Sequence, residues 1–267
     1  MHTLVICCDL DGTLLDADNR IHPHDRALLG NGGAPILVPA TGRPLHSLRW
    51  ALEANRLFVG QPIPLPLIVL NGGAVYLPGE QLVSSRGLEP DVQAELLTRL
   101  PNFPEVTFLI YTMDAVYVLG QNDRTRPLIE FWRLAPRPYD PDTPRAYMKV
   151  LCLAETSALL EPFAASIADL PLACALAMPG VMEVTSLGVD KARAASSLLD
   201  ALGLDPSCLV AVGDGENDLP LFDLAAVSFC PDTAPEAIRA QADHVIDARS
   251  RGVLEPVLDY LAAEGCL

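Results

Sequence analysis

Basic residues are scarce in this sequence. Lys and Arg together number 18 against 34 Asp and Glu, which gives a formal net charge of −16 at pH 7 for the 267 residues. No run rich in Lys or Arg occurs anywhere in the chain. Because nucleic acids and anionic membrane surfaces are bound chiefly through clustered cations, we expect neither as a partner. An anionic substrate would have to be attracted locally, by a metal ion or by a few placed cations.

Paired cysteines and long hydrophobic runs are also missing. The seven cysteines are an odd number without a C-x-x-C pair, and most lie in apolar segments, as is typical of buried free thiols in a reducing cytoplasm. The longest uncharged apolar stretch, near Leu170–Met182, contains Pro and Gly and is too short to cross a bilayer. No basic segment precedes the first apolar run, so no signal peptide is expected. These features predict a cytoplasmic protein.

Short apolar runs alternate with helical patterns at both ends of the chain. Near the N-terminus, runs at Thr3–Cys8, Pro35–Pro39 and Leu67–Leu70 are separated by helical patterns at Pro23–Leu29 and Pro44–Asn55. The alternation resumes with a helix at Lys191–Leu202 and continues to a strand at His244–Ile246. Such alternation is typical of βαβ units on a parallel sheet.

The middle of the chain follows another pattern. Two short runs flank the turn Pro78-Gly79-Glu80 as in a hairpin, and adjacent strands are expected at Val106–Tyr111 and Ala115–Leu119, between helices at Pro90–Leu100 and Thr156–Leu170. A sheet with adjacent strands indicates an α+β domain. We therefore expect an α/β fold in which residues 1–84 and 186–267 form a Rossmann-like core with a parallel sheet, and residues 85–185 form an inserted α+β cap domain.

Four of the apolar runs end in polar side chains. In an open parallel sheet, ligands bind where the carboxyl ends of the strands meet the following loops. One polar strand end is ordinary, but four on one sheet edge indicate a binding site. The residues are Asp9 and Asp11 after Leu4–Cys8, Thr41, Gly42 and Arg43 after Ile36–Ala40, Asn71 after Leu67–Leu70, and Asp214 after Leu209–Gly213.

Lys191 is one of only two lysines and follows Asp190, a good helix N-cap. A cation in the first turn of a helix opposes the helix dipole, and local violations of this kind tend to mark functional positions. A solvated surface lysine is the alternative. If Lys191 belongs to the site, it supplies one of the few placed cations.

The segment "GDGEND", residues 213–218, places Asp214 and Asp218 on either side of a glycine turn that opens a helix. Helix capping alone would account for Asp218. If these carboxylates converge with Asp9 and Asp11, they repel one another unless a cation lies among them. A hard divalent cation with oxygen ligands resolves this repulsion, and Mg²⁺ is the expected one.

"DLDGT" at 9–13, "ATGR" at 40–43, Lys191 and "GDGEND" at 213–218 resemble, in this order, the four motifs of the haloacid dehalogenase superfamily of phosphotransferases. "NGG" at 71–73 and the insert between the second and third motifs resemble its Cof-like branch, whose members carry a type IIB α/β cap. The resemblance covers nearly the whole chain. It implies phosphoryl transfer through an aspartyl-phosphate intermediate.

A carboxylate at a strand end can attack phosphorus and divide the displacement into two easier steps. Asp9 is the expected nucleophile, and Asp11 is placed to protonate the leaving alcohol and then to activate water; the resemblance implies the same roles. The transferred group also needs its charge neutralised. The expected ligands are Asp9, the Asp11 backbone carbonyl and Asp214 for Mg²⁺, and Thr41, Gly42, Lys191 and Asn217 for the phosphoryl group. Supporting roles are expected for Asp218, Asn71 and Arg43, with Asp218 orienting Lys191 or a metal-bound water.

The sequence thus favours a Mg²⁺-dependent phosphatase that acts on a small phosphomonoester, such as a sugar phosphate or a phosphorylated cofactor. A phosphomutase on the same scaffold and a non-catalytic metal- or ligand-binding protein are the alternatives. The intact pair Asp9 and Asp11 argues against pure binding, which needs no acid or base. The expected cap domain also contains a group of six cations. Either all of them pair with acidic surface residues, or one or two of them bind the substrate beyond its phosphoryl group. The six are Arg124, Arg126, Arg133, Arg137, Arg145 and Lys149.

Overall fold

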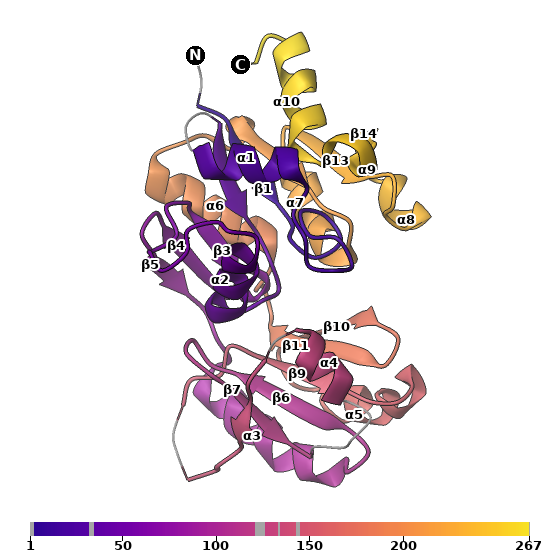
Figure 1. Cartoon of the computed structure of the whole chain (residues 1–267). Helices are drawn as coiled ribbons and strands as arrows, with labels where there is room; N and C mark the ends of the chain where they lie inside the picture. Colours follow the sequence, from indigo (N-terminus) through magenta and orange to yellow (C-terminus); the bar gives the residue numbers. More distant parts are fainter. Residues whose placement is uncertain (1–2, 32–34, 121–125, 133, 143–144, 267) are drawn as a thin grey trace. The chain divides into compact units, whose positions relative to one another are not determined.

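The computed structural model describes residues 3–31, 35–120, 126–132, 134–142 and 145–266 (Figure 1). The chain forms two compact units. The first contains Met1–Arg43, Leu48–Ser85 and Asp190–Leu267, and the second contains Pro44–Ser47 and Arg86–Val189. Both ends of the chain therefore contribute to the first unit.

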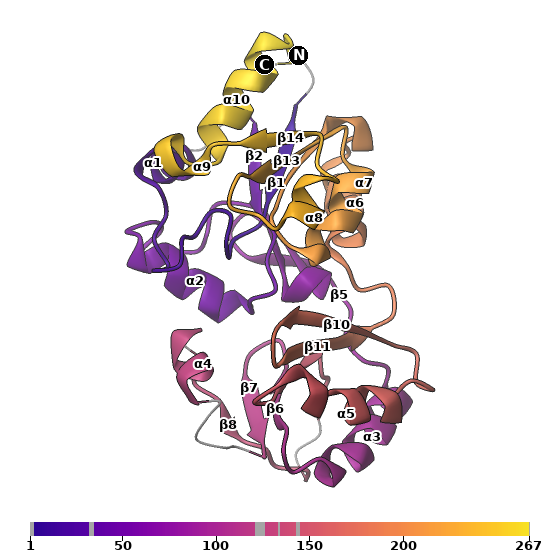
Figure 2. The ribbon, with the colours of Figure 1, turned by 90° about the vertical axis from the view of Figure 1, so that its right-hand side faces the viewer.

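A five-stranded parallel sheet forms the centre of the first unit (Figure 2). Its order is β14-β13-β12-β1-β2, so the first strand of the chain lies inside the sheet. All four residues of β1 are buried, which explains why its sequence is a continuous apolar run. The expected α/β fold with a parallel core sheet is confirmed. The strands are β1 (Val5–Cys8), β2 (Ile36–Pro39), β12 (Leu209–Val212), β13 (Val227–Pro231) and β14 (His244–Ile246).

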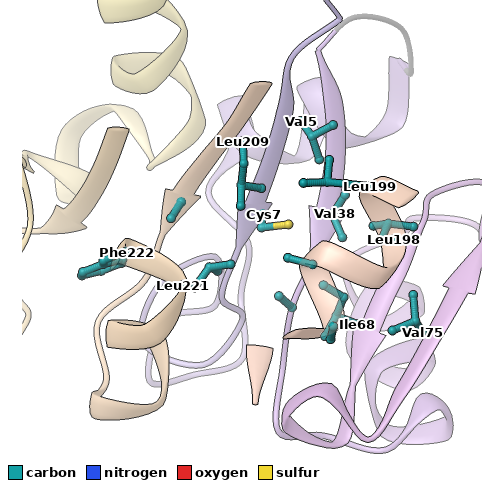
Figure 3. Packing of buried hydrophobic residues seen from close by; sticks show 14 of the residues in the cluster. Val5, Cys7, Val38, Ile68, Val75, Leu198, Leu199, Leu209, Leu221 and Phe222 are labelled. Carbon is teal, nitrogen blue, oxygen red and sulfur yellow. The ribbon is translucent and has the colours of Figure 1, made fainter. Parts of the chain in front are cut away.

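Helices α6 and α7 pack against one face of this sheet. Leu198 of α6 and Leu221 of α7 belong to one buried cluster with Val5, Cys7 and Leu209 of the central strands (Figure 3). Burial of these side chains fixes the register of the helices on the sheet, because interiors are closely packed. The helices of this unit are α1 (Pro23–Asn31), α2 (Leu45–Ala54, which belongs to this unit from Leu48 on), α6 (Lys191–Leu202), α7 (Leu219–Leu224), α8 (Glu236–Arg239), α9 (Ala248–Arg251) and α10 (Leu254–Ala263).

The run Leu67–Leu70 does not simply extend the parallel sheet. Strand β3 (Leu67–Val69) pairs antiparallel with β4 (Ala74–Leu77), which pairs with β5 (Gln81–Ser85) in the expected hairpin. One parallel bridge, between Ala40 and Ile68, joins β3 to the chain after β2. The polar residues that follow β2 and β3 therefore still lie next to each other.

The second unit is built on a six-stranded, mostly antiparallel sheet of order β10-β11-β9-β6-β7-β8. Phe108 of β6 and Phe163 of α5 lie in its buried cluster with their ring centroids 5.0 Å apart. The strands are β6 (Thr107–Tyr111), β7 (Val116–Leu119), β8 (Arg137–Pro138), β9 (Lys149–Leu153), β10 (Leu172–Met178) and β11 (Val181–Ser186), and the helices are α3 (Pro90–Arg99), α4 (Arg126–Phe131) and α5 (Glu161–Ser166).

The helix expected at Thr156–Leu170 is shorter in the structure. A 3-10 turn covers Ser157–Leu159, and α5 begins only at Glu161, with Pro162 in its first turn. Proline has no N–H and disfavours helical backbone in the residue before it, so a helix starts at this position more readily than it continues through it. The expectation of one long helix was wrong: Pro162 accounts for its late start, and α5 also ends early, at Ser166.

The cap cations differ in their surroundings. Lys149 is buried, and its Nζ donates to Glu183 Oε1 at 2.5 Å. Arg145 is half-buried with its guanidinium carbon 3.8 Å from the centroid of the Tyr117 ring, whereas Arg126 and Arg137 are exposed. Arg124 and Arg133 lie outside the described residues. Substrate binding by one or two of these cations stays a prediction.

All seven cysteines are free thiols, and five of them are buried. Burial raises the pKa of the Cys7 thiol to about 12, which keeps it protonated at neutral pH. Among the residues that the structure describes, no helix is long and apolar enough to span a membrane.

A buried aspartate links α1 to the start of α10. The Asp25 carboxylate accepts hydrogen bonds from the backbone N–H groups of Val253 and Leu254 at 2.9 and 2.8 Å, and only 1% of the residue is exposed. The first N–H groups of a helix have no partner within the helix, so this side chain replaces the missing acceptors.

Replacing Asp25 by alanine is expected to lower the free energy of unfolding by about 1–3 kcal/mol, because two buried donors lose their acceptor. Urea unfolding followed by circular dichroism measures this loss. Asp25→Asn is the matched control, because it keeps one oxygen acceptor and should lose less stability. Equal stability of wild type and Asp25→Ala would show that the contact does not hold α10 in place.

Candidate active site

Asp9 lies at the carboxyl end of β1, between two neighbouring strands. Cys8 pairs in parallel register with Val212, and the Asp9 N–H donates to the Val212 carbonyl at 2.8 Å. The Asp9 residue is only 6% exposed. Pairing of β1 with β12 thus brings the loop that carries Asp214 next to Asp9, although the two residues are far apart in sequence.

Lys191 forms two buried ion pairs at the start of α6. Its Nζ donates to Asp9 Oδ1 and, at 2.6 Å, to Asp218 Oδ1, and none of its surface is exposed. Burial acts to lower the pKa of Lys191, but the carboxylates of Asp218 and Asp9 outweigh burial and raise the pKa above its usual value. Lys191 is therefore a charged part of the site and not a solvated surface residue.

Asp218 orients this lysine from the turn that opens α7. Its second oxygen, Oδ2, accepts hydrogen bonds from the backbone N–H groups of Asp214 and Gly215, both at 3.0 Å. These bonds fix the carboxylate, which is fully buried, while Oδ1 faces Lys191. Asp218 is thus more than a helix cap, because it also places the ammonium group beside Asp9.

Three carboxylates gather around this point. Single oxygen atoms of Asp9, Asp214 and Asp218 all lie within 4.8 Å of one another. Burial raises the pKa of the Asp9 carboxyl well above its usual range, the Lys191 ammonium opposes this rise, and the charges of Asp218 and Asp214 add to it. The cluster favours a further cation, and its oxygen donors suit a divalent metal ion.

The carboxylates of this cluster differ in how many hydrogen bonds their oxygen atoms already accept. Both oxygens of Asp218 accept hydrogen bonds, whereas Asp214 receives one bond at Oδ1, from Thr13 Oγ1 at 2.6 Å. Gly12 has φ +87°, and a Cβ atom there would lie 2.2 Å from Asp214 Oδ2. A residue with a side chain at position 12 would displace this carboxylate, so glycine is needed in the motif.

The loops after β2 and β3 meet through backbone and side-chain contacts. The Asn71 N–H donates to the Thr41 carbonyl at 3.0 Å, and Asn217 Nδ2 donates to Asn71 Oδ1 at 3.1 Å. Both Leu70 and Asn71 have left-handed backbone, with φ of 56° and 57°. A Cβ atom at Gly42 would lie 2.9 Å from Asn71 Oδ1. Asn71 therefore joins Thr41, Gly42 and Asn217 into one group beside the carboxylate cluster.

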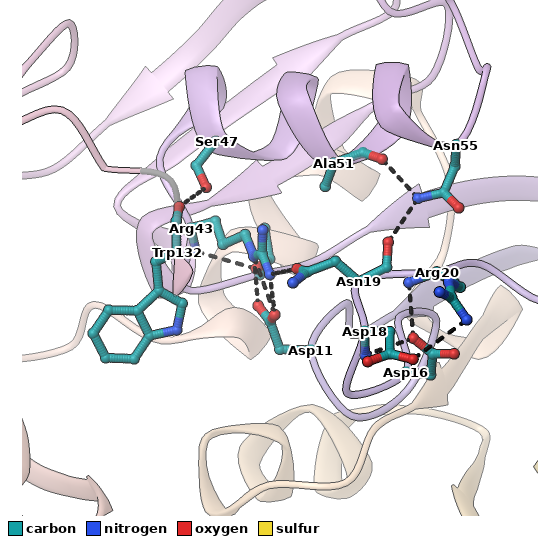
Figure 4. Close-up of polar contacts among 11 residues, drawn as sticks. Asp11, Asp16, Asp18, Asn19, Arg20, Arg43, Ser47, Ala51, Asn55 and Trp132 are labelled. Atoms are coloured by element: carbon teal, nitrogen blue, oxygen red, sulfur yellow. Dashed lines mark hydrogen bonds and ion pairs between the residues drawn. The ribbon is translucent and has the colours of Figure 1, made fainter. Parts of the chain in front are cut away.

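Asp11 has a separate environment from Asp9. The Arg43 guanidinium holds its carboxylate through Nε, at 2.8 Å from Oδ2, and through Nη2 (Figure 4). Arg43 is only 5% exposed, whereas 45% of the Asp11 side chain is exposed. The remaining nitrogen, Arg43 Nη1, is buried and has no hydrogen-bond partner among the described residues. A buried donor without a partner is costly, and an anionic oxygen would satisfy it.

Some contributors to the site were not identified from the sequence. Thr13 contacts Asp214, and its place in "DLDGT" was a signal that could have identified it. Asn19 Oδ1 accepts a hydrogen bond from Arg43 Nη2 at 2.6 Å, but no sequence pattern connects these two positions. Of the expected residues, the structure brings Asp9, Lys191, Asp214 and Asp218 together and places Asp11 against Arg43.

Comparison with known proteins identifies the family of the chain. The sequence pattern of the haloacid dehalogenase-like hydrolases matches residues 6–256. Phosphoglycolate phosphatase of Natronomonas pharaonis is 29% identical over 243 residues, which cover 91% of this chain and 91% of that protein. Pyridoxal phosphate phosphatase YbhA of Escherichia coli is 24% identical over 268 residues, which cover 92% of this chain and 94% of that protein.

A solved structure supports the same assignment at the level of the fold. The subclass IIB sugar phosphatase BT4131 matches with a TM-score of 0.75 at 18% identity, over 99% of this chain and 100% of that one. The chain belongs to the haloacid dehalogenase-like hydrolase family, as the four motifs indicated. The chain is therefore a hydrolase of this family, and the oxygen atoms of its acidic cluster could hold a divalent metal ion.

Proposed function

We propose that the protein is a Mg²⁺-dependent phosphatase that hydrolyses small phosphomonoesters through an aspartyl-phosphate intermediate on Asp9. The observation that carries this proposal is the buried Asp9 carboxylate, which shares Lys191 with Asp218 and lies beside Asp214. A buried carboxylate at a strand end with a fixed cation beside it is suited to nucleophilic attack on phosphorus.

In the first step, an Asp9 oxygen forms a bond to phosphorus while the bond between phosphorus and the alcohol oxygen breaks. Asp11, in its protonated form, gives its proton to the departing alcohol. In the second step, Asp11 takes a proton from water, the water oxygen bonds to phosphorus, and the bond to Asp9 breaks to release inorganic phosphate. Asp11 thus ends the cycle protonated again, as general acid–base catalysis requires.

Charge on the transferred group is neutralised by residues of two loops and of the first turn of α6. Lys191 provides a fixed ammonium, and Thr41, Gly42 and Asn217 supply a hydroxyl and amide N–H groups. Asp9, Asp214 and the Asp11 backbone carbonyl would hold Mg²⁺, which supplies further neutralisation of phosphoryl oxygens when bound. Arg43 Nη1 provides one more donor for an anionic substrate group.

The substrate is a small phosphorylated metabolite, in the class of sugar phosphates and phosphorylated cofactors. Relatives named for phosphoglycolate and pyridoxal phosphate, and a structural neighbour named a sugar phosphatase, support this class. Their names describe hydrolysis, which favours a phosphatase over a phosphomutase. The complete Asp9 and Asp11 pair favours catalysis over binding alone.

Release of inorganic phosphate from a panel of phosphomonoesters, measured with and without Mg²⁺, tests the proposal. We expect turnover of several small substrates that depends on Mg²⁺. Isomerised sugar phosphate without phosphate release would indicate a mutase. Binding without turnover of any substrate would indicate a binding protein, and both results contradict the proposal.

Asp214→Asn is expected to weaken Mg²⁺ binding at least about tenfold, because a charged oxygen ligand becomes a neutral amide. Activity should fall at limiting Mg²⁺ and partly return at high Mg²⁺. Calorimetric titration with Mg²⁺ measures the affinity directly, and Asp223→Asn, at an exposed position of α7, is the matched control. Unchanged Mg²⁺ affinity in Asp214→Asn would remove this residue from the metal site.

A further inference from the structure

Asp11 lies on a partly exposed turn, and what fixes its carboxylate is the Arg43 guanidinium. Nε of Arg43 lies 2.8 Å from Oδ2 and 3.1 Å from Oδ1 of Asp11, and Nη2 also donates to Oδ1. A two-point contact of this kind sets the orientation of a carboxylate as well as its position. The orientation of Asp11 therefore depends on how the guanidinium itself is held.

The Arg43 guanidinium is held from behind by Asn19. Nη2 of Arg43, the same atom that donates to Asp11, also donates to Asn19 Oδ1 at 2.6 Å (Figure 4). Asn19 has left-handed backbone with φ 59°, a conformation that Asn, Asp and Gly adopt more readily than other residues. This backbone conformation is part of how the turn presents the amide oxygen of Asn19 to Arg43.

Asn55, the residue directly after α2, holds the backbone turn that contains Asn19. Asn55 Nδ2 donates to the carbonyls of Asn19 and Ala51 at 2.9 and 2.8 Å, and Asn55 Oδ1 accepts from the Ile21 N–H at 2.8 Å. Asn55 is buried, with 8% exposed. A continuous series of hydrogen bonds thus runs from the end of α2 through Asn19 and Arg43 to Asp11.

We propose that Asn19 is a positioning residue of the phosphatase reaction, which acts through Arg43 to orient the acid and base Asp11. The proposal rests on the proposed function, because it needs Asp11 to transfer a proton to the leaving group. Loss of the Asn19 amide leaves Arg43 free to turn and Asp11 free to change its side-chain conformation. The reaction then loses the alignment of Asp11 with the leaving oxygen.

Asn19→Gly is the informative variant, because it removes the side chain that holds Arg43 and glycine tolerates the left-handed backbone at this position. We expect kcat/KM for an alkyl phosphate, β-glycerophosphate, to fall about 10- to 100-fold, as small misalignments of reacting groups can cost this much. The loss for 4-nitrophenyl phosphate should be much smaller, since its leaving group departs without a proton. The measured quantity is the ratio of kcat/KM for the two substrates.

Three further variants separate positioning from a purely structural role. Asn19→Asp keeps an oxygen acceptor and the same backbone preference, so it should retain most of the wild-type ratio. Asn19→Ala should match Asn19→Gly in the ratio but lose more thermal stability, because alanine is strained at φ 59°. Asp16→Ala removes bonds to the N–H groups of Asp18 and Arg20 in the same turn and should leave the ratio unchanged.

Asp11→Asn distinguishes failure of this inference from failure of the proposed function. If Asp11→Asn shows the substrate-dependent loss and Asn19→Gly keeps the wild-type ratio, the positioning role of Asn19 is overturned and the proposed function stands. Equal losses for both substrates in Asn19→Gly would likewise reduce Asn19 to a structural residue. If Asp11→Asn itself has no effect on either substrate, the proposed acid and base is wrong.

Discussion

Asp9→Asn is expected to lower kcat by at least about a thousandfold, because the amide has nearly the same shape as the carboxylate but cannot form the bond to phosphorus. The measurement is phosphate release at saturating Mg²⁺ and substrate. Asp18→Asn, an exposed aspartate in the same N-terminal segment, serves as the control and should keep wild-type activity. Asp9→Asn activity within about tenfold of wild type would contradict a covalent role for Asp9.

The fold should survive this substitution. The Asp9 carboxyl is buried next to Asp218 and Asp214, and its neutral replacement removes repulsion within the cluster. The melting temperature of Asp9→Asn without Mg²⁺ is therefore expected to equal or exceed that of wild type. Inactivity together with a retained melting temperature would assign the loss to chemistry and not to unfolding.

Lys191→Ala should damage both stability and catalysis. The fully buried ammonium pairs with Asp9 and Asp218, so its removal leaves two buried carboxylates without their counter-ion. Removing one partner of a buried ion pair costs about 3–5 kcal/mol. Urea unfolding should show a loss of this size, and high Mg²⁺ should not restore activity, in contrast to Asp214→Asn.

Arg193→Ala on the same helix is the matched control for Lys191→Ala. The Arg193 side chain is 68% exposed, and its ion pair with Asp190 has a separation of 3.8 Å, so its loss should change stability by no more than about 0.5 kcal/mol. The double variant Lys191→Met with Asp218→Asn should recover part of the lost stability, because one unpaired carboxylate is removed as well. Full stability of Lys191→Ala alone would contradict the buried network.

Helices and strands whose ends are set by residues nearby in the sequence were predicted from the sequence. Helix α6 begins at Lys191 because Asp190 accepts the Arg193 N–H at 2.8 Å, and it ends before Gly203, which has left-handed backbone with φ 67°. The strand His244–Ile246 also has the expected bounds. Caps and periodicity act over a few residues, so the sequence contains enough information to locate these elements.

The pairing of strands from distant segments was not predicted. No strand was assigned to the segments of β10 and β11. Strand β10 pairs with β11, and β11 pairs with β9 in the second unit. Strand β3 resembles another parallel strand, but it pairs mainly with β4. In both cases, contacts between segments that are distant in the sequence determine which strands pair. A local sequence pattern contains no information about such contacts.

The sequence by itself was enough to identify the family and the residues of the carboxylate cluster, because "DLDGT", Lys191 and "GDGEND" are each recognisable within a few residues. Only the tertiary structure decided that Asp11 faces Arg43 and that Asn19 holds Arg43. These contacts join positions 32 and 24 residues apart in the chain. They exist because the parallel pairing of β1 with β2 brings the loops after both strands to one sheet edge.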